Sequence, residues 1–203
     1  MAVPQREIRA VYTPATITVY QAYRPDIAEA AVRAGRFVPP FKRERMTWVK
    51  PSFLWMMYRC GWGAKPGQER VLAVEITRAG FEWALARACL SSYGHGEADH
   101  GDAEDRAEWS RRLRRSPVRV QWDPERSIQL GALPHRSLQL GLSGEAADRY
   151  VDEWTVAIRD VTELAHRVQS TRDPALLPPE RPYPLAPDLA ETIAASAALP
   201  ADR

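Results

Sequence analysis

The chain has 203 residues, of which 45% are apolar and 27% charged, and its formal net charge is +2. This is the composition of a globular protein that is long enough to bury a sizeable core. No apolar run approaches the roughly 20 residues of a membrane span, and so small a net charge does not require a polyanionic partner.

The compartment is expected to be the cytoplasm. The first ten residues, MAVPQREIRA, contain no apolar stretch of the kind found in secretory signals. Cys60 and Cys89 fall inside predicted helices and are expected to be free, buried thiols. Only three of the 28 basic residues are lysines. If the excess of arginine is functional, it suits bidentate binding of phosphate or carboxylate groups.

The first third of the chain predicts two strands and two helices. β-branched and aromatic residues indicate strands at 8–12 and 17–23, and a helix at 25–34 is expected to end at Gly35. Residues 37–45 form a basic loop. The segment 46–63, MTWVKPSFLWMMYRCGWG, then holds five of the 18 aromatic residues, and its apolar residues recur with helical spacing after Pro51.

The remaining elements follow without the regular alternation of a parallel α/β protein. Strands are predicted at 71–77, 118–122, 137–142 and 154–158, helices at 79–90, 107–115 and 161–169, a turn at 123–126, and a short helix after Ser143. We expect one α+β domain over residues 1–170, with mixed or antiparallel sheets and flanking helices. Residues 171–203 are Pro-rich and form a tail, either docked or disordered, with one weak helix near 188–198.

The aromatic segment is the main candidate for a functional site, although a packed core helix would explain it equally well. Trp48, Lys50 and Ser52 place a flat ring, a cation and a hydroxyl within five positions. Aromatic rings with a few convergent polar groups are typical of one wall of a ligand cleft. There is no Gly-rich phosphate loop, paired-Cys zinc pattern or GxSxG motif.

No metal is expected. The loop at 91–104 carries His and acidic side chains, but their spacing matches no known metal site and the loop lacks an apolar frame.

Several motifs resemble those of the bacterial and fungal family called domain of unknown function 4291. They are IRAVY, TVYQAY, the aromatic segment, VQWDPER, RSLQLGLSGEAADRY and VDEW. The resemblance covers roughly residues 6–168, and the aromatic segment is its most specific part.

The order of elements also resembles the ADP-ribosyltransferase fold, and this resemblance implies a set of site residues. The late-strand glutamate of that fold would be Glu153, and the residue supporting nicotinamide would be Ser52, or Tyr58 in the tyrosine variant. Gln21 stands where the fold has an Arg or His on its first core strand. Arg24 and Arg9 are the alternatives for that basic role.

From the resemblance we expect a protein that binds NAD or another nucleotide, with NAD as a substrate whose ADP-ribose passes to an unknown acceptor. Trp48, Lys50, Ser52 and Tyr58 would form the walls of one cleft, between Gln21 or Arg24 and Glu153. The alternative is a non-catalytic module that binds RNA or single strands through basic residues interleaved with aromatic rings. Its basic residues would be Arg43, Arg45, Arg111, Arg112, Arg114 and Arg115.

Overall fold

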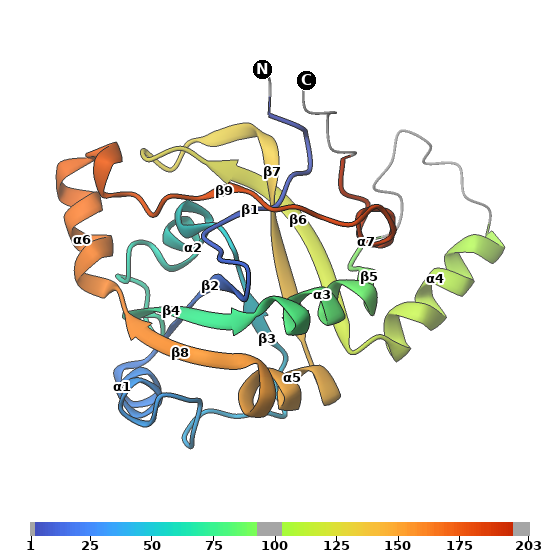
Figure 1. Cartoon of the computed structure of the whole chain (residues 1–203), viewed down its shortest axis with the longest axis horizontal. Helices are drawn as coiled ribbons and strands as arrows, with labels where there is room; N and C mark the ends of the chain where they lie inside the picture. The colour runs from blue at the N-terminus through green and yellow to red at the C-terminus, as the bar shows by residue number, and fades with distance from the viewer. Residues whose placement is uncertain (1–2, 93–102, 197–203) are drawn as a thin grey trace.

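The computed structural model describes residues 3–92 and 103–196 and contains three sheets (Figure 1). An antiparallel sheet has the strand order β2-β4-β8, made of β2 (Thr16–Tyr23), β4 (Arg70–Thr77) and β8 (Thr155–Asp160). A four-stranded sheet has the order β3-β7-β6-β5, made of β3 (Thr47–Val49), β7 (Ala132–Leu142), β6 (Val118–Arg126) and β5 (Ala88–Leu90). Only the β5–β6 pair in it is parallel. The third sheet pairs β1 (Arg9–Ala10) with β9 (Arg181–Pro182).

Helices flank these sheets, as expected for the α+β class. They are α1 (Pro25–Ala34), α2 (Phe53–Cys60), α3 (Arg78–Ala86), α4 (Ala103–Arg115), α5 (Glu145–Arg149), the π-helical turn η1 (Tyr150–Trp154), α6 (Thr162–Thr171), the short 3-10 turn η2 (Pro174–Leu176) and α7 (Pro187–Thr192). Figure 1 shows α1 and α4 at opposite ends of the long axis of the molecule. Within the described ranges, no helix is both long enough and apolar enough to cross a bilayer.

A backbone joint connects the two larger sheets. Tyr20 of β2 and Lys50, which directly follows β3, exchange backbone hydrogen bonds with N···O distances of 2.7 and 3.2 Å. The main core fills the space between the sheets with buried aliphatic and aromatic side chains, including Val74 and Leu140. A second buried cluster, which includes Phe53, packs α2 and α6 against the other side of β2 and β4. The joint therefore fixes the end of β3 and the start of α2 relative to β2.

Several predicted elements are confirmed, some with changed limits. The helix at 25–34 has the predicted limits, and Gly35 ends it in the left-handed region with φ of 65°. Gly can adopt this conformation without steric cost. The predicted helix at 79–90 is wrong in its last part, because Ala88–Leu90 form β5 and pair with β6. A short apolar segment does not distinguish a helix end from a buried strand.

The predicted turn at 123–126 is also wrong. β6 continues to Arg126, and a register shift between Pro124 and Arg126 accommodates the proline. Such an irregularity tolerates the missing N–H of proline within a sheet.

The C-terminal segment packs against the domain as far as residue 196. Tyr183, Leu189 and Ile193 are buried in the main core, and the Trp122 indole N–H donates to the Ile193 carbonyl at 2.8 Å. α7 overlaps the first part of the weak helix predicted near 188–198, and β9 pairs with β1. The predicted acidic loop falls largely on residues 93–102, which lie outside the described residues.

Candidate functional site

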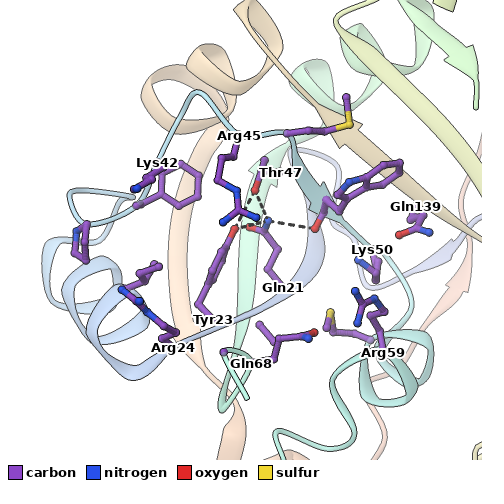
Figure 2. A pocket seen from close by; sticks show the side chains of 18 residues that line it. Gln21, Tyr23, Arg24, Lys42, Arg45, Thr47, Lys50, Arg59, Gln68 and Gln139 are labelled. Carbon is purple, nitrogen blue, oxygen red and sulfur yellow. Dashed lines mark hydrogen bonds between the residues drawn. The ribbon is translucent and has the colours of Figure 1, made fainter. Parts of the chain in front are cut away.

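A cavity of about 710 Å³, called the larger cavity below, lies between β2, β3, the loop after α1, and α2 (Figure 2). Its lining contains five cationic side chains: Arg24, Lys42, Arg45, Lys50 and Arg59. None of the lining residues is Asp or Glu. Figure 2 shows Lys50 beside Arg59 on one side of the cavity and Arg24 with Lys42 on the opposite side. Cations without neutralising carboxylates create a strongly positive potential inside a concave, low-dielectric space.

One wall of the cavity depends on a glycine. Trp48 of β3 pairs with Gly141 of β7. A Cβ atom at Gly141 would lie 2.7 Å from the Met46 sulfur and 3.0 Å from the Trp48 ring. Because the glycine has no side chain, both neighbours can lie flat against β7, where they line the cavity.

A buried, uncharged hydrogen-bond network lies at the centre of the lining. The Gln21 Nε2 lies 2.8 Å from the Tyr23 hydroxyl and 2.9 Å from the Thr47 Oγ1, and its Oε1 accepts from the Tyr150 hydroxyl at 2.6 Å. Burial raises the pKa of both tyrosines, so both stay neutral. The network therefore holds Gln21 in place and adds no charge to the cavity.

Lys50 is the most buried of the five cations. Its side chain lines the cavity although the residue is only 4% exposed. Among the described residues, no acceptor lies within hydrogen-bond or ion-pair distance of its ammonium. Burial, together with the neighbouring Arg59 charge, lowers its pKa from 10.5 to about 8. The negative charge of Asp123 raises the pKa of Lys50. The Asp123 carboxylate, however, already accepts hydrogen bonds from two glutamine amides, one of them on Gln139.

The other four cations have exposed side chains at the rim of the cavity. Arg24 makes a two-pronged ion pair with Asp26, with N···O distances of 3.0 and 2.6 Å. Lys42, Arg45 and Arg59 have no ion pair within the described part of the chain. They are therefore available to an anionic ligand without first losing a protein partner.

A smaller cavity of about 240 Å³ lies at the N-terminal end of α2. The Ser52 hydroxyl donates to Glu125 at 2.9 Å and accepts from the backbone N–H of Trp55 at 3.1 Å, so it caps the helix. Glu180 accepts from the backbone N–H of Phe53 at 2.7 Å. Burial first, and the field of Glu125 second, raise the pKa of Glu180 to about 8.

The structure distributes the predicted site residues over different places. Gln21, Arg24, Trp48 and Lys50 line the larger cavity, whereas Arg9 and Ser52 line the smaller one. Tyr58 is 39% exposed, and the Arg126 guanidinium lies 3.6 Å from its ring centroid.

Glu153 lines neither cavity. It was predicted to open a strand, but it lies in η1, and β8 begins at Thr155. Tyr150 and Trp154 of this turn are buried, which leaves Glu153 exposed and ion-paired with Arg149 at 3.0 Å. The sequence therefore predicted a single cleft where the structure has two separate cavities and an exposed carboxylate.

Two groups of cavity residues were not singled out from the sequence. Tyr23 lies on the same face of β2 as Gln21. Because residues two positions apart in a strand share a face, the sequence could have indicated that Tyr23 lies beside Gln21. Gln139, which lines the cavity, and Tyr150, which only donates to Gln21 from behind the lining, come from distant segments, and no local pattern reveals their role. The two interpretations of the aromatic segment apply to different residues, because Trp48 lines the cavity whereas Phe53 and Met57 are buried in a core cluster.

The described residues contain no group of three or more His, Cys, Asp or Glu side chains placed to hold a metal ion. In a comparison with protein families, the model described as domain of unknown function (DUF4291) matches residues 7–183. No curated protein matches the chain.

Proposed function

The chain belongs to the DUF4291 family, and from that premise we propose that its larger cavity binds NAD or another nucleotide through the phosphate groups. The observation that carries the proposal is the lining: five cations, three of them at the rim without an ion pair, and no carboxylate. Guanidinium groups suit phosphate oxygens because they offer several N–H donors in one plane.

The size and polarity of the cavity support a small-molecule ligand. A volume of about 710 Å³ falls within the range of roughly 300–1,000 Å³ that is usual for such sites. Trp48 offers an aromatic surface for a base, and Gln68 offers an amide for hydroxyl or ring nitrogen atoms. The hydrogen-bonded Gln21 network shapes the space between the two basic sides.

We propose more specifically that the protein transfers ADP-ribose from NAD, which is the activity that the fold resemblance implies. Cleavage of NAD in that manner uses a carboxylate beside the ribose to stabilise developing positive charge. Glu153 is the residue assigned to this role, and it lies on the surface outside the described lining. Incubating the Glu153→Gln variant with NAD tests the assignment. Loss of turnover with unchanged folding supports it, and wild-type turnover refutes it.

Thermal shift with NAD, ATP and GTP tests binding, because a ligand that binds only the folded state raises the melting temperature. Adenosine, which lacks phosphate, is the matched ligand control. We expect the nucleotides to raise the melting temperature and adenosine to have a much smaller effect. An equal response to adenosine, or none to the nucleotides, would contradict phosphate recognition.

A matched pair of variants locates the binding. Arg45→Gln with Arg59→Gln removes two unpaired cations from the cavity rim. Arg111→Gln with Arg115→Gln removes two exposed cations from α4, at the other end of the molecule (Figure 1). Only the first pair should weaken nucleotide binding. Equal losses in both pairs would indicate a general charge effect.

The alternative, a module that binds RNA or single strands, is also a proposal that salt can test. Its expected basic residues occupy distant places: Arg43 pairs with Asp152 at 2.8 Å, whereas Arg111 to Arg115 belong to α4. Figure 1 shows α4 far from α1 and the loop that follows it. Affinity for single strands that falls steeply with salt would favour this alternative; absent binding would remove it.

A further inference from the structure

Lys50 differs in its surroundings from the other two lysines of the chain. Lys42 is exposed at the rim of the cavity. Lys65 is exposed, and its ammonium donates to the carbonyl of Arg59 at 2.8 Å. Lys50 is almost completely buried, lines the cavity, and has no described acceptor within hydrogen-bond distance. Only Lys50 therefore combines a buried amine, a cavity large enough for a ligand, and the absence of a partner in the described residues.

The backbone of Lys50 is fixed next to the cavity. Lys50 exchanges two hydrogen bonds with Tyr20, and the residues that follow it are Pro51 and Ser52, the N-cap of α2. The Lys50 backbone cannot move away from the cavity without breaking the joint between the two larger sheets. Because the residue is only 4% exposed and lines the cavity, its side chain lies between this fixed backbone and the cavity.

The surroundings also favour the neutral form of the amine. A buried ammonium without a counter-ion loses hydration, and Arg59 adds like-charge repulsion. At pH 8, about half of the Lys50 side chains are neutral, given a pKa of about 8. At the same pH of about 8, an ordinary lysine amine, with a pKa near 10.4, is neutral in only about 0.4% of molecules. Neutral lysine amines in such environments are the ones that attack carbonyl carbons.

We propose that Lys50 is a nucleophile that forms an imine with the carbonyl group of a phosphorylated aldehyde or ketone bound in the larger cavity. The inference rests on the proposed function, since the surrounding arginines hold the phosphate. It names the ligand class more narrowly: an anion with a reactive carbonyl, such as the open-chain form of a sugar phosphate. ADP-ribose belongs to this class, because its free anomeric carbon opens to an aldehyde.

The reaction balances without a redox partner. The lone pair of the Lys50 Nζ forms a C–N bond with the carbonyl carbon, and the electron pair of the C=O π bond moves to oxygen. A proton leaves the nitrogen, and the oxygen gains one, through water. The nitrogen lone pair then expels the hydroxyl group, which leaves as water after taking up a second proton. The products are a protonated imine and one water molecule.

Reductive trapping tests this reaction directly in the full chain. Pyridoxal 5′-phosphate serves as the probe, borohydride reduces any imine, and peptide mass mapping locates the adduct. The chain offers only three lysines and the α-amino group as targets. At pH 8 we expect Lys50 to be labelled at least about tenfold faster than Lys65, given its larger neutral fraction.

Two related probes separate the parts of the proposal. Pyridoxal lacks the phosphate, so it should label Lys50 more slowly than pyridoxal 5′-phosphate does, and any preference over Lys65 that remains reflects the larger neutral fraction of Lys50. Pyridoxine 5′-phosphate carries an alcohol in place of the aldehyde, so it should form no adduct but should protect Lys50 from labelling. The Lys50→Arg variant keeps a cation at this position and should lose the fast adduct while it still binds pyridoxine 5′-phosphate.

The possible results distinguish imine formation at Lys50 from binding of the phosphate group. Labelling spread evenly over the three lysines, or confined to Lys42 and Lys65, overturns the imine. If pyridoxine 5′-phosphate raises the melting temperature while pyridoxal 5′-phosphate leaves Lys50 unlabelled, the result supports phosphate binding and refutes imine formation at Lys50. If the probes neither bind nor label Lys50, the imine proposal is refuted, and the thermal-shift assay with NAD, ATP and GTP decides nucleotide binding separately. The mapping uses the wild-type protein, so it does not depend on whether a variant folds.

Discussion

Replacing Lys50 with methionine should stabilise the ligand-free protein at neutral pH. Methionine keeps most of the buried aliphatic volume and removes an ammonium that has no described counter-ion. The pKa of Lys50 falls from 10.5 to about 8, which at about 1.4 kcal/mol per pKa unit gives an upper bound of roughly 3 kcal/mol. Because water in the cavity offsets part of this cost, we expect a gain of about 1–3 kcal/mol in the free energy of unfolding.

Urea unfolding of both proteins across pH provides the assay. Since the folded state holds the Lys50 proton less tightly than the unfolded state, the stability of the wild-type protein should rise between pH 8 and pH 10.5. The difference between variant and wild type should therefore be largest below pH 8 and should shrink as the pH rises. A variant that is equally stable or less stable at pH 7 would refute the reasoning. A bound phosphorylated ligand should narrow the difference, because the wild-type cavity keeps one more cation than the variant.

Three further substitutions test other parts of the structure. Glu180→Gln keeps the acceptor for the α2 backbone and removes a carboxyl group whose pKa is raised to about 8. Wild-type stability should fall as the pH rises from 4.5 to 8, and the variant should lack this fall and be more stable at pH 8 by roughly 1–3 kcal/mol, as urea unfolding measures. Gly141→Ala should press its Cβ against the Trp48 ring, lower stability by about 1–3 kcal/mol, and weaken nucleotide binding in calorimetry. Tyr150→Phe should leave the buried Gln21 oxygen without its donor and cost about 1–3 kcal/mol in urea unfolding.

Each of these predictions has an outcome that opposes it. An unchanged pH profile in Glu180→Gln would show that this carboxyl group does not titrate as the structure indicates. Gly131→Ala is the control for Gly141→Ala, because the nearest atom to its added Cβ is a side-chain oxygen at 3.4 Å. If both alanines have the same effect, the Trp48 contact is not the cause. A Tyr150→Phe variant as stable as wild type would mean that water replaces the lost hydroxyl.

The sequence predicted local features well and long-range arrangements less well. The limits of α1 follow from Pro25 and Gly35, and the strand at 17–23 from its β-branched residues, so both depend on nearby residues alone. Lys50 was singled out with its aromatic neighbours as one wall of a ligand cleft, and it lines the larger cavity, but its functional role stays a prediction.

The position of Glu153 depended on distant contacts. A π-helical turn and the burial of its flanking aromatics decide where that carboxylate points, and no local spacing encodes either. β5 could not be predicted for the same reason, since it exists only through its pairing with β6.

The closure between residues 6 and 196 affects how the protein is made. Ser196 and Arg6 exchange hydrogen bonds, each with a distance of 2.9 Å, and β1 pairs with β9. The Trp122 indole N–H donates to the carbonyl of Ile193, which lies 71 residues later in the sequence. During synthesis, this hydrogen bond cannot form until Ile193 has been made. The core is thus completed only after residue 193 has left the ribosome, and nascent chains stopped before this point would expose apolar surface to chaperones.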